Sequence, residues 1–116
     1  MMESMYKYMK VGIIHFMAYP VLDGKGPITE TLYEIAEDDY FTAVEISWIK
    51  DHIVKEKAKK ILETSHLTIV YGASPRLLTT GLDINSLDED MRHKALATLK
   101  EGIDEAYEMG QPVFLF

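Results

Sequence analysis

The residues in this sequence that could bind a small molecule fall at the expected carboxyl ends of β-strands. They are His15, Glu45, Trp48, Tyr71 and Arg76. In parallel α/β proteins, ligands bind at this edge of the sheet and in the loops that follow it. The sequence therefore predicts a substrate-binding pocket that these side chains line.

Glu45 is the most informative of these candidates, because it interrupts the otherwise apolar segment "AVEISW". A carboxylate in such a segment is unfavourable unless it is paired, bound to a ligand or protonated. Glu45 could line a pocket and bind a substrate hydroxyl or a cation. It could also form an ion pair with a lysine or arginine at the end of the sheet, and the sequence leaves both interpretations open.

The other four candidates also have a binding and a structural interpretation. His15 could bind a hydroxyl or act as an acid or base, or it could be a hydrogen-bonded histidine at the end of a buried strand. Trp48 and Tyr71 could stack on the apolar face of a sugar, although large aromatic residues at strand ends more often belong to the core. Arg76 could hold a phosphate or carboxylate bidentately, or it could contact only solvent.

Other kinds of site find less support in the sequence. The histidines are scattered, no two of them are four residues apart, and there is no cysteine, so no metal site is predicted. The segment "GKGP" before an expected helix could hold an anion at the helix N-terminus. Because it lacks the phosphate-loop and dinucleotide fingerprints, a flexible loop is the favoured interpretation. No nucleophile–base–acid set is visible, so no catalytic residue is assigned.

Composition limits the classes of protein to which the chain can belong. The 116 residues are enough for one domain, and 47% of them are hydrophobic. The net charge of −7 would repel a nucleic-acid backbone, and no apolar run reaches the ~20 residues that a membrane-spanning helix needs. The lack of cysteine suits a reducing cytoplasm. Residues 1–8 are expected to be a leader or a disordered start.

Hydrophobic patterns predict a βαβαβαβ order over residues 9–116, with strands near 10–16, 42–48, 67–72 and 112–116. Pro27 is placed as the first residue of one helix and Asp51 as the N-cap of the next. Ser86 and Glu89 have the spacing of a capping box before a third helix, whose apolar stripe is Leu96, Leu99, Ile103 and Ala106. Gly110 is placed to end that helix. Residues 72–85 are predicted to form an unusually long loop.

Strand–helix–strand units of this length predict parallel pairing and leave two architectures. One is the first half of a (β/α)₈ barrel, of the form (βα)₃β, in which all helices cover one face of the sheet. The other is an open flavodoxin-like sheet with helices on both faces. The placement of the helices distinguishes the two.

The segments "VGIIHFMAYP", "IAEDDYFTAVEISWIKD" and "LETSHLTIVYGASPRLLTTGLDINSLDED", together with "ALATLKEGIDEAYEMG", resemble the amino-terminal part of sugar phosphate isomerase/epimerase-like proteins. These belong to the xylose-isomerase-like (β/α)₈ barrels. The resemblance implies a divalent metal, held by carboxylates and a histidine on later strands that this sequence does not contain. It implies a role in enclosing a sugar or sugar phosphate for His15, Glu45 and the region from Tyr71 to Arg76, and no metal bound by this chain alone.

The resemblance also implies that "PVFLF" is the fourth strand of eight, so that the chain is expected to be an incomplete fragment. Such a piece exposes apolar strand faces and two unpaired edges, and it is expected to be inactive alone and to form a homo-oligomer or to need a C-terminal half. The alternative is a non-enzymatic α/β binding module with a complete, covered sheet. No nucleic-acid or membrane partner is expected.

Overall fold

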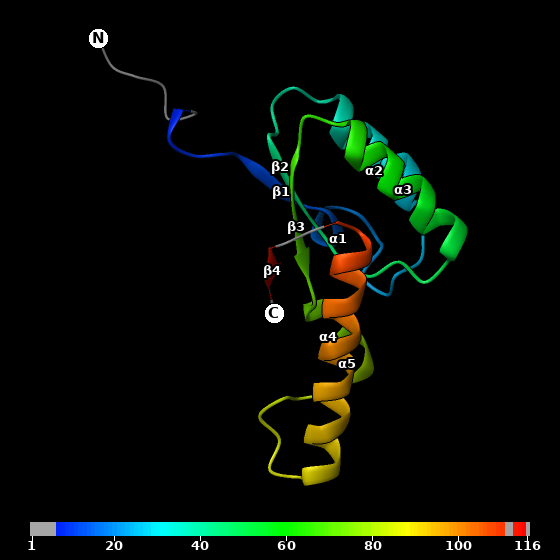
Figure 1. Cartoon of the computed structure of the whole chain (residues 1–116), viewed down its shortest axis with the longest axis vertical. Coiled ribbons are helices and arrows are strands. Elements are labelled where there is room, and N and C mark those ends of the chain that lie inside the picture. Colours follow the sequence, from blue (N-terminus) through cyan, green and yellow to red (C-terminus); the bar gives the residue numbers. More distant parts are fainter. Residues whose placement is uncertain (1–6, 111–112, 116) are drawn as a thin grey trace.

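The computed structural model describes residues 7–110 and 113–115 of the chain (Figure 1). Residues 1–6 of the predicted leader, and residues 112 and 116 of the predicted fourth strand, lie outside this described part. The elements, in order, are β1 (Gly12–Ile14), α1 (His15–Ala18), α2 (Ile28–Glu37), β2 (Ala43–Ile46), α3 (His52–Thr64), β3 (Thr68–Gly72), α4 (Ser74–Thr80), α5 (Glu89–Glu108) and β4 (Phe114–Leu115).

The strands form one four-stranded sheet in the order β1-β2-β3-β4, and every neighbouring pair is parallel. The register places Ile14 beside Glu45 and Glu45 beside Val70, while Gly72 pairs with Leu115. The predicted α/β class with a parallel sheet is confirmed. Each strand lies next to the strand that precedes it in the sequence.

Alternate residues of the strands face the core. Val44, Ile46 and Tyr71 are at most 1% exposed and belong to the hydrophobic core that the helices cover. Figure 1 shows α2, α3 and α5 on the same side of the sheet. On the other face, Ile14 remains 39% exposed and Leu115 49% exposed. We call this uncovered side the open face.

Local signals explain where several helices begin and end. The Asp51 carboxylate accepts hydrogen bonds from the N–H groups of Ile53 and Val54, at 2.8 and 3.0 Å, so the predicted N-cap of α3 is confirmed. Pro27 directly precedes α2, where its missing N–H leaves no helical bond unmade. Gly110 follows α5 with a φ of +77°, a left-handed conformation that glycine adopts without strain.

Two predicted boundaries, in the first strand and in the segment after the third strand, differ in the structure. The first strand is shorter than residues 10–16, because the chain turns into the helical segment α1 at His15. Residues 72–85 are not a structureless loop, since they contain α4. Pro75 lies in the first turn of α4, and Gly81, with a φ of +67°, ends it. Both signals were present in the sequence.

The start of α5 also differs from the prediction. Its N-cap is Asp88, whose carboxylate accepts from the N–H groups of Asp90 and Met91 at 2.9 and 3.3 Å. Ser86 instead accepts a bond from the Asp88 N–H at 3.1 Å. A carboxylate is a stronger acceptor than a hydroxyl and interacts favourably with the helix dipole, which explains why the helix begins two residues later. Among the described helices, none is both long enough and apolar enough to cross a bilayer.

Candidate functional site

Glu45 lies in the middle of the open face, between Ile14 on β1 and Val70 on β3. Its carboxylate leans over Gly72, because a Cβ built on that glycine would lie 2.5 Å from Glu45 Oε2. Burial raises the pKa of Glu45 above its usual value. Within the described residues, Glu45 makes no hydrogen bond and no ion pair, so the alternative interpretation, a pair with a lysine or arginine, is not observed there.

A shallow groove of about 290 Å³ surrounds this carboxylate on the open face. Its lining is mostly apolar and includes Gly12, Ala43, Val70 and Leu115, with the Lys10 side chain among the lining groups. The Lys10 ammonium donates a hydrogen bond to the Thr68 hydroxyl. An unpaired carboxylate in an apolar groove can accept a bond from a ligand hydroxyl, or donate one when it is protonated.

Trp48, Tyr71 and Arg76 come together at the carboxyl edge of the sheet, but on the helix-covered side. The guanidinium carbon of Arg76 lies 5.2 Å from the centre of the Trp48 ring, and Arg76 Nε donates to the Tyr71 hydroxyl at 3.1 Å. Tyr71 follows Val70 on β3, so its side chain points away from the face that carries Glu45. The structure therefore groups three of the predicted site residues and separates them from Glu45.

Glu105 on α5 completes this group, although it is not one of the site residues that the sequence predicts. Its carboxylate accepts from the Tyr71 hydroxyl at 2.5 Å and pairs with Arg76 Nη2 at 3.1 Å and with Lys55 Nζ at 2.8 Å. Glu105 is only 5% exposed, and a buried carboxylate needs partners of this kind. We call Lys55, Tyr71, Arg76 and Glu105 the Glu105 network.

The predicted apolar stripe of α5 is confirmed at Leu99 and Ala106 and is wrong by one position at Leu96 and Ile103, which explains the omission. The structure buries Ala95, Leu99, Gly102 and Ala106, together with Glu105, whereas the predicted Leu96 and Ile103 are 44% and 38% exposed. Small residues on the buried face let α5 approach the sheet closely: a Cβ on Gly102 would lie 3.5 Å from Ala73 and from Phe114. Ala95, Leu99, Gly102 and Ala106 are spaced by four, three and four, and this run of small and apolar residues is the signal that could have located this face.

The protonation of the Glu105 network follows from its geometry. Burial, and then the charge of Glu105, raise the pKa of Tyr71 far above its usual value, so its hydroxyl keeps its proton. Burial alone would lower the pKa of Arg76 and of Lys55, but their acidic and phenolic partners raise both. Every donor is thus held in its proton-bearing form. The network joins β3, α3, α4 and α5, and its bonds are used within the protein.

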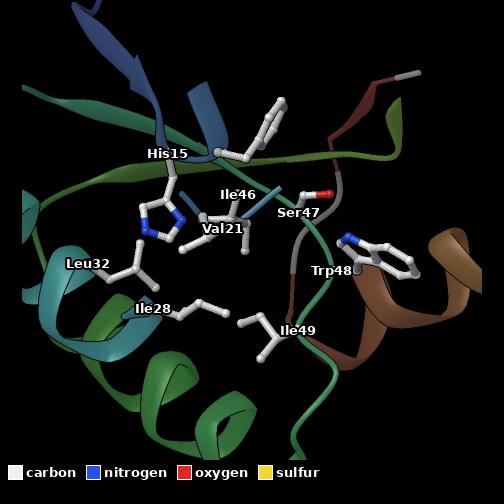
Figure 2. A pocket seen from close by; sticks show the side chains of 9 residues that line it. His15, Val21, Ile28, Leu32, Ile46, Ser47, Trp48 and Ile49 are labelled. Carbon is white, nitrogen blue, oxygen red and sulfur yellow. The ribbon is translucent and has the colours of Figure 1, made fainter. Parts of the chain in front are cut away.

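His15 is buried, with 3% of its surface exposed, and its imidazole faces the inside of the helical layer (Figure 2). Its Nε2 lies 2.7 Å from Thr31 Oγ1, and the Thr31 hydroxyl lies 2.6 Å from the Pro27 carbonyl oxygen, to which it donates. Because that hydroxyl proton is already used, His15 Nε2–H is the donor, a role that the neutral ring can fill. Burial lowers the pKa of His15 to about 4, in agreement with this neutral form.

The cavity beside His15 is too small for a sugar. It measures about 10 Å³, which is room for roughly one water molecule, and its walls are largely the apolar side chains of Val21, Ile28, Leu32 and Ile46 (Figure 2). The environment of His15 therefore matches the structural interpretation, a hydrogen-bonded histidine at the end of a strand. Among the predicted site residues, Glu45 has a carboxylate on an accessible surface with no partner in residues 7–110 and 113–115.

The glycine-containing loop before α2 forms the side of a wider groove of about 440 Å³. Gly24 and Gly26 have φ values of +78° and +113°, and the Gly24 carbonyl accepts from the Lys50 N–H at 3.0 Å. Lys50 also lies 4.5 Å from the centre of the Trp48 ring. The loop is thus tied to the residues that follow β2 by a backbone bond.

These features define the class of the protein: an α/β domain with a sequentially ordered parallel sheet, whose open face carries a carboxylate without a partner in the described part of the chain. Neither a scan against models of protein families nor a search of curated proteins finds a match to this chain. Among the described residues, Glu45 belongs to no group of three or more potential metal ligands.

Proposed function

We propose that this chain forms the first half of a (β/α)₈ barrel of the sugar isomerase/epimerase type and contributes a wall of the substrate pocket. The observation that carries the proposal is the strand order β1-β2-β3-β4 with α2, α3 and α5 on one side (Figure 1). A doubly wound sheet reverses its strand order and places helices on both faces. In a barrel, consecutive strands are neighbours and the helices lie outside. The observed strand order therefore favours a barrel over a doubly wound sheet.

The open face gives a second reason for a barrel. Parallel sheets are almost always covered on both sides, and the strands of this one carry exposed Ile14 and Leu115 on the uncovered side. Strands β1 and β4 each have a single neighbour among the described strands, so two edges are available for pairing. We propose that four further strands close the barrel, from additional chain or from a second copy of this one.

Glu45 is the group that we propose contacts the substrate. In a closed barrel the open face becomes the interior, where Glu45 would bind a hydroxyl of a sugar or sugar phosphate. A divalent metal belongs to the complete barrel and would be held by residues of later strands, so the half that this chain supplies is inactive alone. The cytoplasm is the proposed location, since a chain without cysteine suits a reducing compartment.

Self-association tests the barrel and its open face. The experiment is sedimentation velocity of the purified chain over a range of concentrations, with Val70→Glu as the variant on the open face. Leu78→Glu is the matched control, since Leu78 is 70% exposed on α4. We expect the wild type and Leu78→Glu to form dimers and Val70→Glu to shift towards monomer. A monodisperse monomer at all concentrations would contradict closure by a second copy.

Binding then tests the assigned ligand. A panel of aldoses, ketoses and their phosphates is titrated into the associated wild type and into Glu45→Gln, with isomerase activity measured in the presence of divalent metal. We expect weak binding that Glu45→Gln reduces, and no turnover. Sugar binding that Glu45→Gln leaves unchanged would refute the assigned role, and metal-dependent turnover by the chain alone would refute the inactive half-barrel. A covered, monomeric form that binds a sugar would instead favour the non-enzymatic module.

A further inference from the structure

Three potential metal ligands lie together on the outer helical layer, away from the open face. His52 and Glu56 are one turn apart on α3, and Glu108 is the last residue of α5. One ligand atom from each of the three lies within 4.8 Å of the other two, and all three residues are exposed. The spacing of the histidines alone does not reveal this group, because the helical pair here is a histidine and a glutamate.

The backbone beneath these side chains is held by the Glu105 network. Lys55 lies in the same turn of α3 as His52 and Glu56, and its ammonium pairs with Glu105 at 2.8 Å and with Glu108 at 3.5 Å. Because Glu105 is buried, this ion pair fixes the first turns of α3 against the last turns of α5. The ligands therefore project from two helices that the ion pairs of Lys55 link, and residues four apart share one face of a helix.

We propose that His52, Glu56 and Glu108 bind a divalent transition-metal ion, with Zn²⁺ the best match. One imidazole nitrogen and two carboxylate oxygens are a mixed set that suits Zn²⁺, whereas Mg²⁺ and Ca²⁺ prefer oxygen ligands alone. Three protein ligands and a water molecule would complete a tetrahedral site. Zinc needs its ligand atoms ~2.0–2.2 Å away, so these exposed side chains must rotate slightly inwards.

The charges around the group allow a dication to bind. The carboxylates of Glu56 and Glu108 offset its two positive charges, and Lys55 keeps its shorter ion pair with Glu105 when Glu108 turns to the metal. A bound ion would clamp the end of α5 to the start of α3. This site is independent of the proposed sugar pocket, and either can fail without the other.

The chain supplies a close internal control. His93 and Glu89 are also a histidine and a glutamate four residues apart on an exposed helix face, with 4.0 Å between His93 Nε2 and Glu89 Oε1. Among the described residues, this pair has no third ligand near enough to form a group of three. If a helical histidine–glutamate pair were sufficient, both places would bind zinc equally.

The experiment is isothermal titration of ZnCl₂ into the untagged full chain and its His52→Ala, Glu56→Gln and His93→Ala variants, with MgCl₂ as the comparison ion. We expect one zinc per chain, an affinity at least ~10-fold lower in His52→Ala and in Glu56→Gln, and wild-type affinity in His93→Ala. Saturating zinc should also raise the Tm of the wild type by about 4 °C or more, and that of His52→Ala by less.

The results that would overturn the proposal are equally specific. They are wild-type zinc affinity in His52→Ala, an equal loss of affinity in His93→Ala, or the absence of both heat and a shift of Tm in the wild type. His52 and Glu56 are exposed, so neither substitution removes a buried contact and misfolding would not obscure the result.

Discussion

The Tyr71 hydroxyl donates a 2.5 Å hydrogen bond to Glu105 Oε1 and so joins the end of β3 to a helix 34 residues further along the chain. Arg76 and Lys55 pair with the same carboxylate. These bonds hold α5, which leads to β4, in place on the sheet. The Glu105 network is therefore expected to contribute substantially to the stability of this half of the domain.

Substitutions in the Glu105 network should differ in their effect on stability. Tyr71→Phe removes one donor and leaves Glu105 with two cations, so we expect a loss of about 1–2 kcal/mol in the free energy of unfolding. Glu105→Ala leaves the buried Arg76 and the half-buried Lys55 without their shared partner and should cost ~3–5 kcal/mol. Urea unfolding at pH 7 measures both values.

Glu101 provides the control for these two variants. It is also an acidic partner of Arg76, at 3.6 Å, but its side chain is 70% exposed. Exposed ion pairs contribute little, so Glu101→Ala should change the free energy of unfolding by less than ~1 kcal/mol. Equal losses in the Glu101 and Glu105 variants would show that the buried geometry has no special role.

The sequence predicted the parallel α/β class and the cap at Asp51 because both follow from local patterns. It did not locate Glu105, since a glutamate in a charged helix has the appearance of a solvent-facing residue until the sheet places Tyr71 and Arg76 beside it. The packing of Glu105 beside Tyr71 and Arg76 depends on contacts between residues far apart in the sequence. Helical periodicity constrains such contacts only loosely.

Only part of the candidate site could be predicted from the sequence, because the rest again depends on contacts between residues far apart in the chain. Strand alternation separates Glu45 from Val44 and Ile46, and the structure places it on the opposite face from those two residues, as expected. The sequence could not show that the open face stays uncovered by the described helices, nor that His15 bonds to Thr31. The first depends on how all the helices pack on the sheet, and the second on how α1 and α2 pack together.

His15 should make the stability of the domain decrease in mild acid. Its pKa is lowered from 6.5 to about 4 in the folded protein, so the unfolded chain binds a proton more readily between these two values. Stability is then fully present above pH ~6.5 and is lost as the pH falls towards 4, by up to about 3 kcal/mol. Urea unfolding at a series of pH values from 7.5 to 4 tests this.

The contribution of His15 is isolated by comparison with His15→Gln, which does not titrate. We expect the difference in free energy of unfolding between wild type and His15→Gln to shrink as the pH falls through this window. A difference that stays constant from pH 7.5 to 4 would mean that His15 is not buried in its neutral form. His66, an exposed histidine that contacts the Phe41 carbonyl, provides a control in His66→Gln.

Glu45 should give the stability of the domain a pH dependence opposite in sign to that of His15. Burial raises its folded pKa, so the folded protein binds this proton more tightly than the unfolded chain, and stability is lost as the pH rises from about 4.5 through the folded pKa. We expect Glu45→Gln to be more stable than the wild type at pH 8, with the difference disappearing near pH 4.5. The same urea series measures it, and a less stable Glu45→Gln at pH 8 would indicate a partner for the carboxylate.

Gly72 should tolerate a methyl group only when Glu45 is shortened. A Cβ at Gly72 would lie 2.5 Å from Glu45 Oε2 and 3.1 Å from its Cδ, so Gly72→Ala must displace the carboxylate from its present position. In a Glu45→Ala background that obstacle is gone, and the same substitution should be neutral or stabilising, by up to about 1 kcal/mol, because alanine restricts the unfolded chain. A double-mutant cycle by urea unfolding measures the coupling, which we expect to exceed ~0.5 kcal/mol. Additive effects of the two substitutions would show that the Glu45 carboxylate does not lie over Gly72 in solution.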